Sequence, residues 1–202
     1  MDCRDKRVRD FEVVRVNIGD IRNFIEEWHY SKNTNGLSAK YCFALFSDNN
    51  LIGAMIYGDI SMQGVWKKYA EQKDDVIELK RLCCIDDTPK NTESYFIGKT
   101  LRWLKKNTNI LTVISYADTT HNHTGVIYKA SNFTHIGMTQ AGKMISFEEK
   151  LYHDKTIRTT YINKDGVKNL KPFAQKIKDA LDSGKASFIK TKPKHIYTYK
   201  LR

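Results

Sequence analysis

A carboxylate and a phenol follow one apolar segment of this sequence at positions that suit proton transfer. Residues 110–115 predict a short buried strand, Asp118 follows it, and Tyr128 lies in a short helix expected over residues 124–131. A carboxylate at the carboxyl end of a strand, beside a helix that presents a phenol, can supply an acid and a base at one edge of a sheet. The alternative is that Asp118 caps a turn and Tyr128 is a core aromatic whose hydroxyl reaches water. Their placement at the same sheet edge favours the chemical interpretation.

A second polar group surrounds an arginine inside an apolar strand. Residues 77–85 (IELKRLCCI) alternate partly and predict a central strand that contains Arg81. A guanidinium among apolar neighbours is costly unless it is paired or holds an anion. The alternative is that Arg81 lies at the strand end and reaches solvent or a carboxylate such as Asp118. The adjacent Cys83 and Cys84 are expected to point to opposite faces of the strand.

Histidines at a helix end and in a loop complete the chemically capable residues. His29 and Tyr30 close a helix that is expected to begin at Asp20, as its N-cap, and to end near residue 30. There His29 can interact with the last carbonyls of the helix, or act as a base or a metal ligand. His121 and His123 form a His-x-His pair, but no carboxylate or cysteine at a defined distance completes a ligand set.

Hydrophobic periodicity predicts the elements that position these residues. Strands are expected at 11–17, 41–46, 51–57, 77–85, 110–115, 134–138 and 196–201, a late hairpin at 143–151 with 157–162, and helices at 20–30, 94–107, 124–131 and 173–181. The polar segment 60–75 predicts a loop or lid. This order predicts an α/β (α+β) fold with a mixed central β-sheet of six or seven strands and helices on both faces. We expect residues 1–162 to form the catalytic domain and residues 163–202 to add a basic helix and strand to the same domain.

This arrangement resembles the GNAT acyltransferase fold, in which the fourth strand leads into a helix whose N-terminal amides hold the pyrophosphate of coenzyme A. The matching segment here is 86–94 (DDTPKNTES), where Thr92 and Ser94 would by default cap the helix. The Arg-x-x-Gly-x-Gly/Ala loop of coenzyme A users is missing. The segment also holds one lysine against three acidic residues, which would repel a pyrophosphate.

The charge of the chain points to a polyanionic partner. Its net charge is +11, and residues 153–202 hold 13 Lys/Arg against 4 Asp/Glu. A solvated basic tail is the plain alternative. Aromatic residues interleave with the C-terminal lysines, which favours phosphate contact with base stacking: Phe188, Tyr197 and Tyr199 among Lys185, Lys190, Lys192 and Lys194. In the expected lid, Trp66, Lys67 and Lys68 form a similar group.

Composition excludes several classes of protein. Apolar runs such as residues 51–57 are far shorter than the roughly 20 residues of a membrane span, and the charged start predicts no secretory signal. Four cysteines, two of them adjacent, do not form a disulfide pattern. We therefore expect a protein of the cytoplasm with no membrane partner.

Five short motifs, in this order and spacing over about residues 10–162, resemble the Mom family of phage DNA-modification proteins. They are His29-Tyr30-Ser31, Glu78-Leu79-x-Arg81-Leu82, Asn91-Thr92-Glu93-Ser94, Tyr116-Ala117-Asp118 and Ile127-Tyr128-Lys129-Ala130-Ser131. The resemblance implies an enzyme of phage or prophage origin, related to the acyltransferase fold. It would convert adenine N6 in DNA to a carbamoylmethyl derivative, so that host restriction enzymes fail to cut.

Carried over by motif position, the resemblance assigns roles to individual residues. It implies that Arg81, Asp118 and Tyr128 are catalytic, with Ser94, beside Thr92, at the donor site. It also implies an iron site at His29 and Tyr30. The donor stays open among acyl-coenzyme A, an aminoacyl-tRNA and another carrier, because the pyrophosphate loop is missing.

Double-stranded DNA as substrate would require base flipping, since an enzyme cannot reach a base amine inside a duplex. Tyr30, Tyr57, Trp66 and Tyr69 are candidates for an aromatic slot that receives the base. Two other functions remain. One is an N-acyltransferase that acts on a protein or a small amine, and the other is a non-catalytic DNA-binding protein on a GNAT-like fold.

Overall fold

The computed structural model describes residues 2–62, 64–121 and 123–202, which form two compact units. The first unit comprises residues 1–138 and 195–202, and the second residues 139–194. The expected boundary at residue 162 therefore differs from the division in the structure, because the final strand belongs to the first unit. Among the described residues, no helix has both the length and the apolarity needed to cross a bilayer.

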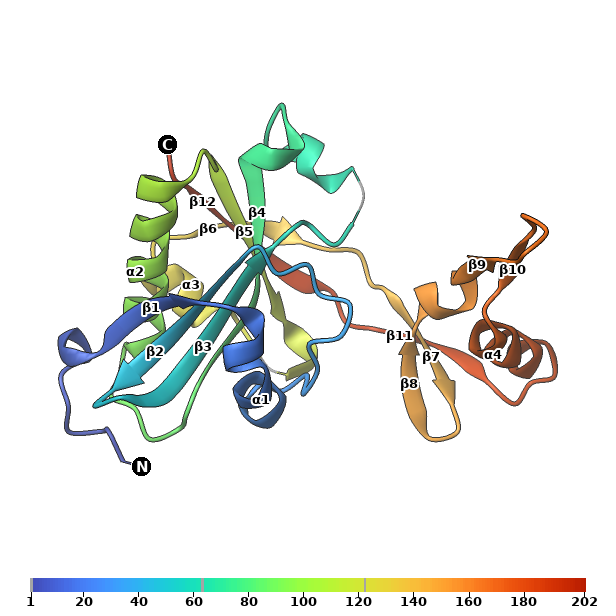
Figure 1. The fold of residues 1–202 in the computed structure, drawn as a ribbon, viewed down its shortest axis with the longest axis horizontal. Helices are drawn as coiled ribbons and strands as arrows, with labels where there is room; N and C mark the ends of the chain where they lie inside the picture. The colour runs from blue at the N-terminus through green and yellow to red at the C-terminus, as the bar shows by residue number, and fades with distance from the viewer. Residues whose placement is uncertain (1, 63, 122) are drawn as a thin grey trace. The chain divides into compact units, whose positions relative to one another are not determined.

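A seven-stranded sheet forms the centre of the first unit (Figure 1). Its strands, in spatial order, are β1 (Glu12–Val16), β2 (Tyr41–Ser47), β3 (Asn50–Gly58), β4 (Val76–Cys84), β5 (Thr112–Asp118), β12 (Lys194–Lys200) and β6 (Thr134–Met138). The first four strands are antiparallel neighbours, β4 and β5 are parallel, and β12 and β6 are antiparallel. The expected mixed sheet is confirmed, as is the hairpin of β2 and β3.

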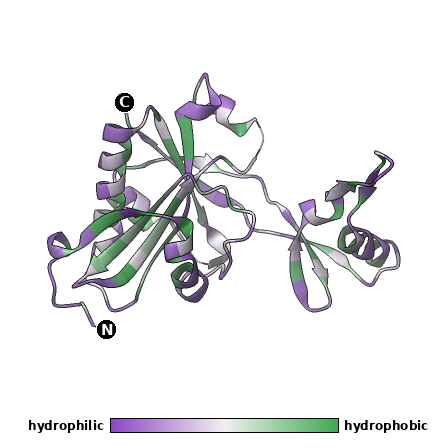
Figure 2. Ribbon diagram, in the orientation of Figure 1, coloured by the Kyte–Doolittle hydropathy of each residue, from purple (hydrophilic) through white to green (hydrophobic). Residues whose placement is uncertain are grey.

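Helices cover both faces of this sheet, because alternate residues of β2 and β3 are apolar on both sides. Helix α1 (Ile18–Trp28) buries Ile21 and Ile25 against one face, and α2 (Thr92–Asn107) and the short α3 (Val126–Ala130) pack against the other. Figure 2 shows hydrophobic residues along β2 and β3. The first turn of α1 corrects one expectation: Asn17 is the N-cap, and the Asp20 carboxylate accepts the Asn17 backbone N–H at 2.8 Å.

The segment between β3 and β4 contains two short 3-10 helices, η2 (Val65–Lys68) and η3 (Lys73–Asp75). The sequence predicted a loop or lid here. Two side-chain contacts hold its beginning: Ser38 Oγ donates to Asp59 at 2.8 Å, and Lys40 pairs with Asp59 at 2.8 Å.

The second unit is a small sheet with one helix. Strand β7 (Lys143–Phe147) lies between β8 (Lys150–His153) and β11 (Ser187–Lys190), and α4 (Pro172–Asp182) covers its core of Ile145, Phe147, Ile177, Ala180 and Ala186. A two-stranded ribbon pairs β9 (Thr160–Ile162) with β10 (Lys168–Leu170).

The predicted late hairpin is therefore wrong in its second strand. Residues Asp154–Arg158 form the 3-10 helix η5, and β7 pairs with the nearby β8 through a turn in which Glu148 and Glu149 have positive φ. Strand β11 was not predicted, since all four of its residues are exposed and give no apolar–polar alternation.

Candidate active site at the divergence of β4 and β5

The two parallel strands of the first unit separate partway along their length. Their register runs from the pair Val76–Thr112 to the pair Leu79–Ser115, and the described remainder of each strand makes no further pair with the other. At the point of separation, Ser115 Oγ donates to the Leu79 carbonyl at 3.2 Å. In open sheets, ligands bind where neighbouring strands part at their carboxyl ends. This divergence is therefore the natural location for a site, and the predicted site residues of β4 and β5 flank it.

A bulge in β4 sets which side chains face the α1 side of the sheet. Arg81 pairs with Ile56 and Leu79 pairs with Tyr57, so Lys80 is an extra residue without a partner on β3. A bulge reverses the alternation of side chains, so Lys80 and Arg81 share one face with Glu78. The core confirms this, because Cys83 packs in the cluster that contains Ile21 and Ile25 of α1, while Cys84 packs against the cluster that contains Phe96 and Ile97 of α2. The expectation that the two cysteines point to opposite faces is confirmed.

A buried ion pair occupies this face. Glu78 Oε2 lies 3.2 Å from Lys80 Nζ, and the two side chains are only 11% and 3% exposed. Ser61 completes the group: its backbone N–H and its hydroxyl donate to Glu78 Oε2 at 2.9 and 3.2 Å, and Lys80 Nζ donates to Ser61 Oγ at 2.7 Å. Buried charges require such partners. This pair was not predicted, although a glutamate and a lysine two residues apart in an apolar strand are a readable signal.

Arg81 is desolvated and only partly bonded. Its guanidinium donates to the Lys80 carbonyl at 2.8 Å and, more weakly, to the Asn33 carbonyl at 3.5 Å. Its Nε is the one buried side-chain nitrogen or oxygen of the described residues without a hydrogen-bond partner. Burial lowers the pKa of Arg81, with Tyr30 and Glu78 opposing that shift. A cation with an unused, desolvated donor is suited to an anion or a carbonyl oxygen.

Tyr128 approaches the divergence from the opposite face. Its phenol hydrogen-bonds with Ser115, and its ring packs against Phe133 and Tyr197 with centroids 5.6 and 5.2 Å away. Burial raises the pKa of Tyr128 to about 12, and nearby Tyr30 and Glu78 add to the shift. The phenol is therefore protonated at neutral pH, as a proton donor must be.

A glycine allows α3 to hold Tyr128 there. Gly125, at φ 75°, precedes the helix, and a Cβ at this position would lie 2.2 Å from the Tyr197 ring. Tyr197 in turn donates its hydroxyl proton to the Thr124 carbonyl at 2.8 Å. A close contact between α3 and β12 thus holds Tyr128 beside Ser115, on the face of the sheet opposite to that of Asp118.

Asp118 is the last residue of β5, half-buried, and its Oδ1 accepts the backbone N–H of Thr120 at 3.0 Å. The carboxylate therefore caps the 3-10 turn η4 (Thr119–His121), as its plain alternative predicted. Alternation along β5 places Asp118 on the same sheet face as Tyr116. Val113 and Ala117 of β5 pack on the α2 side, so Tyr116 and Asp118 point to the other face, which also carries Glu78 and Arg81. Burial raises the pKa of Tyr116, and Glu78 adds to the shift.

His29 and Tyr30 lie at the end of α1. His29 is buried, its Nδ1 accepts the Ser31 backbone N–H at 3.1 Å, and Ser31 Oγ lies 2.8 Å away. The Tyr30 ring is tilted against that of His29 with centroids 4.2 Å apart and meets His123 edge-on at 5.1 Å. The side chain of His121 lies outside the described residues.

The expected iron site finds no support in this arrangement. In the described part of the chain, no three His, Cys, Asp or Glu residues cluster closely enough to hold a metal ion. One nitrogen of His29, Nδ1, already accepts a hydrogen bond within the chain.

The residues at the start of α2 do not fit the pyrophosphate of coenzyme A. Thr92 Oγ1 donates to the Pro89 carbonyl at 2.7 Å and Ser94 Oγ to the Asn91 carbonyl at 3.0 Å, so both hydroxyls serve their own loop. Asn91 is the N-cap, in the left-handed region at φ 70°, which corrects the expectation that Thr92 or Ser94 caps the helix. Acidic residues outnumber the one lysine around this turn.

Some aromatic residues proposed to hold a base are core residues. Tyr57 is fully buried and hydrogen-bonds with Thr100 at 2.7 Å, so its assignment to an aromatic slot is wrong. Tyr197 is buried as well, and Tyr199 packs against Phe133 with centroids 5.3 Å apart. Accessible ring surface remains on Tyr30, Trp66, Tyr69 and Phe188, of which Tyr30 is 43% and Phe188 52% exposed.

The predicted nucleic-acid-binding lysines belong to different parts of the chain. Lys67 and Lys68 are exposed on η2, where Lys67 Nζ lies 5.8 Å from the centre of the Trp66 ring. Lys185, Lys190 and Lys192 are exposed in the second unit, and Lys194 is half-buried. The second unit holds 13 Lys/Arg against 6 Asp/Glu, a net charge of +7, compared with +4 for the larger first unit. The positive charge is therefore concentrated in residues 139–194.

The mixed sheet with helices on both faces has the fold of the GNAT acetyltransferases. A chimeric spermidine N-acetyltransferase from Vibrio cholerae and hSSAT matches with a TM-score of 0.52 and 11% identity, over 95% of this chain and 96% of that one. An aminoglycoside acetyltransferase, solved with ribostamycin and coenzyme A, matches with a TM-score of 0.51 and 10% identity, over 95% and 93% of the two chains.

Within that fold, the chain belongs to the Mom protein family, whose model matches residues 10–202. The match includes the C-terminal segment that the sequence motifs did not reach. The chain is 26% identical to Methylcarbamoylase mom of Escherichia phage Mu over 152 residues, which are 74% of this chain and 62% of that protein. The chain thus aligns with less than two thirds of the length of this relative. The expected family and the expected fold are both confirmed.

Proposed function

We propose that this protein is a transferase that modifies the N6 amine of adenine in DNA to a carbamoylmethyl derivative, and that this modification protects phage DNA from restriction. The observation that carries the proposal is membership of the Mom family over residues 10–202, together with the position of the family motifs. Three of the five motifs lie in β4, at the end of β5 and in α3, which are the elements around the divergence.

The roles of the site residues follow from their surroundings. Arg81, with a buried and unused Nε donor, would bind an oxygen of the transferred group. Tyr128, whose pKa is raised to about 12 by burial, would donate a proton to the leaving group. Asp118 would accept a proton from the adenine amine or orient that amine. Thr92 and Ser94 would lie on the donor side, as the family motif implies.

Double-stranded DNA is the partner that the charge distribution supports. A unit with a net charge of +7 binds phosphates with little sequence dependence, as a modifier of many genomic sites requires. Lys185, Lys190, Lys192 and Lys194 would supply these contacts, with Trp66, Lys67 and Lys68 of η2. Tyr30, Trp66 and Tyr69 would receive the flipped base.

Mass spectrometry of nucleosides from DNA of expressing cells tests this function. We expect a deoxyadenosine derivative heavier by one carbamoylmethyl group in cells that express the protein, and none in cells that express the Arg81→Ala variant. DNA with only unmodified deoxyadenosine, from cells that contain folded wild-type protein, would refute the proposal. An N-acyltransferase acting on another amine is the second candidate, favoured by the fold, and acetylated protein or polyamine in the same cells would support it.

A further inference from the structure

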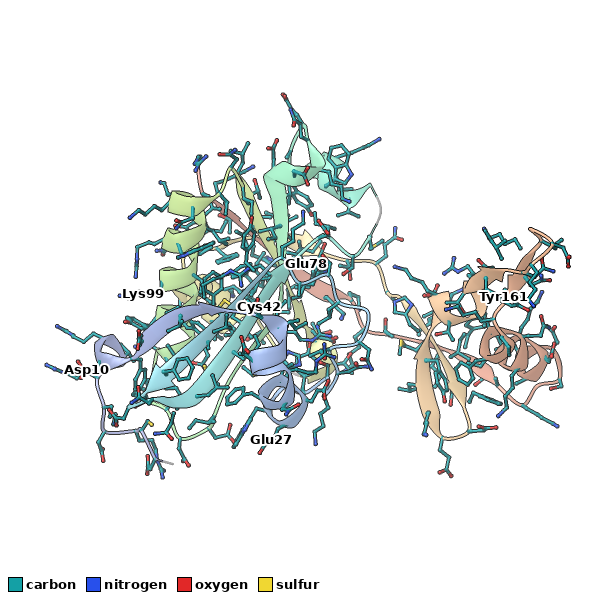
Figure 3. All side chains as sticks on the ribbon, in the orientation of Figure 1. Asp10, Glu27, Cys42, Glu78, Lys99 and Tyr161 are labelled. Atoms are coloured by element: carbon teal, nitrogen blue, oxygen red, sulfur yellow. The ribbon has the colours of Figure 1, made fainter. Side chains whose placement is uncertain are left out.

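The buried carboxylate of Glu78 lies at the base of the β4–β5 divergence. Glu78 is level with Ile114 in the parallel register, one pair before the last one. It is 9% exposed, and the bulge at Lys80 places it on the face that also carries Arg81 and Asp118. Figure 3 labels Glu78 on β4 near the middle of the sheet.

The two oxygens of this carboxylate have different environments. Each hydrogen bond that the structure gives to Glu78 ends on Oε2, with Ser61 N, Ser61 Oγ and Lys80 Nζ as donors. Within the described part of the chain, Oε1 accepts none, and it is not among the fully buried atoms without a partner. Oε1 is therefore both free to accept a hydrogen bond and reached by solvent. A carboxylate oxygen has two lone pairs, so this acceptor capacity is unused.

The groups around Glu78 make it the central charge of the site. Its charge helps to raise the pKa of Tyr116 and of Tyr128, and it opposes the fall in the pKa of Arg81. These three side chains come from β5, α3 and β4. Because Glu78 and Arg81 share one face of β4, a group that reaches Oε1 would meet a guanidinium with an unused donor and a negatively charged acceptor.

We infer that Glu78 Oε1 accepts an N–H of the acceptor amine and thereby orients its nitrogen, leaving Asp118 the role of proton acceptor. This inference rests on the proposed function, which supplies a primary amine as substrate. An exocyclic amine has two N–H donors, and a hydrogen bond to one of them fixes the direction of the lone pair. Lys80 and Ser61 are positioning residues, because they hold Oε2 and so set the direction of Oε1.

The substitution Glu78→Gln reverses the polarity of this contact with little change in shape. The donors Ser61 and Lys80 require an acceptor at the Oε2 position, so the amide oxygen will take that place. The amide NH2 then replaces Oε1 and presents donors to an amine that also donates. Glu26→Gln is the matched control, since Glu26 is half-buried, accepts Thr34 Oγ1 at 2.8 Å, and lies on α1.

Two DNA duplexes measure the contact by binding alone. Each consists of G·C pairs with one extrahelical base, which is adenine in the first and purine, without the 6-amino group, in the second. A hydrogen bond to a charged acceptor predicts that wild-type protein binds the adenine duplex about 10- to 100-fold more tightly. We expect this ratio to fall to near one in Glu78→Gln and to stay unchanged in Glu26→Gln. Because the ratio compares two ligands on one preparation, partial misfolding of a variant cancels.

Two results would overturn the inference: a ratio near one in the wild-type protein, or the full wild-type ratio in Glu78→Gln. Glu78→Asp is the second variant if Glu78→Gln does not fold, and its shorter side chain should lower the ratio. Failure of the proposed function is recognised separately. Modified deoxyadenosine in cells together with a ratio near one refutes only the role of Glu78, whereas folded protein without modified deoxyadenosine refutes the proposed function.

Discussion

Replacing Tyr128 with phenylalanine separates a chemical role of the phenol from a structural one. The change removes one hydroxyl that hydrogen-bonds with Ser115 and keeps the ring against Phe133 and Tyr197. Ser115 still donates to the Leu79 carbonyl, so no buried donor is left without a partner. The loss of one neutral hydrogen bond should therefore lower the free energy of unfolding by about 1 kcal/mol. If the phenol donates the proton in the reaction, the rate of modification should fall about 100-fold or more.

The raised pKa of Tyr128 adds a second, independent signature. The pKa is about 12 in the folded chain, against the ordinary tyrosine value of 10.0, so the folded chain holds this proton more tightly than the unfolded chain does. The stabilisation is complete below pH 10 and is lost as the pH rises towards 12. Two pKa units correspond to about 3 kcal/mol in all, of which about 2 kcal/mol is lost between pH 10 and pH 12, so wild-type protein should lose about 2 kcal/mol more than Tyr128→Phe over this interval.

Chemical denaturation at pH 8, 10 and 12, with nucleoside mass spectrometry at pH 8, measures both effects on one preparation. Tyr57→Phe is the control, since Tyr57 is also a buried phenol with a raised pKa but lies in the core, where it hydrogen-bonds with Thr100. An activity of Tyr128→Phe within about threefold of wild type would show that the phenol only packs. Equal alkaline destabilisation of wild type and variant would refute the buried environment that we assign to it.

Three further perturbations test other parts of the structure. Changing Lys190, Lys192 and Lys194 together to Gln should weaken DNA binding and reduce the slope of the log association constant against log salt concentration by about 0.9 for each phosphate that is no longer neutralised. The same change at Lys99, Lys105 and Lys106 on α2 should alter neither the affinity nor the slope. An unchanged slope in the first variant would exclude its three lysines from the DNA interface. Gly125→Ala should destabilise the first unit by clearly more than Gly36→Ala, for which about 1 kcal/mol is expected. Both glycines have positive φ, but only at Gly125 would an added Cβ collide with the Tyr197 ring, so equal destabilisation would contradict that close approach. Lys80→Met should lower the free energy of unfolding by about 3 kcal/mol, because it leaves the Glu78 carboxylate buried without its cation. Lys67→Met, at an exposed residue of η2, should change it by almost nothing. An unchanged stability of Lys80→Met would show that the pair is not buried in solution.

Much of the first unit was predictable because its strands and helices carry strong local signals. The β2–β3 hairpin follows from two apolar runs around Asp48 and Asn49, which adopt the positive φ that such turns need. Helix α2 follows from its amphipathic spacing. Strand β5 and the short helix α3 were also predictable, but order along the chain did not show that Asp118 and Tyr128 lie on opposite faces of the sheet.

Other features depend on contacts that periodicity does not encode. The bulge at Lys80 changes which residues share a face, so the position of Arg81 on the face of Glu78 and Lys80 could not be read from simple alternation. Tyr57 resembled an accessible aromatic residue in the sequence, but β3 is covered on both faces by helices. In the second unit, short exposed strands such as β11 have no apolar–polar alternation. The expected hairpin paired residues 143–151 with 157–162, whereas in the structure β7 pairs with β8, which lies within the first of these segments and just after it.

The central claim is that the residues around the β4–β5 divergence modify adenine. Its most direct test is the content of modified deoxyadenosine in DNA treated with the Asp118→Asn variant. Asparagine keeps the size of the side chain and can still accept the Thr120 N–H, but it removes the charge and the capacity to take up a proton. We predict an unchanged melting temperature, unchanged DNA affinity, and a fall of about 100-fold or more in modification. Normal modification by a well-folded Asp118→Asn protein would contradict the assignment of the active site.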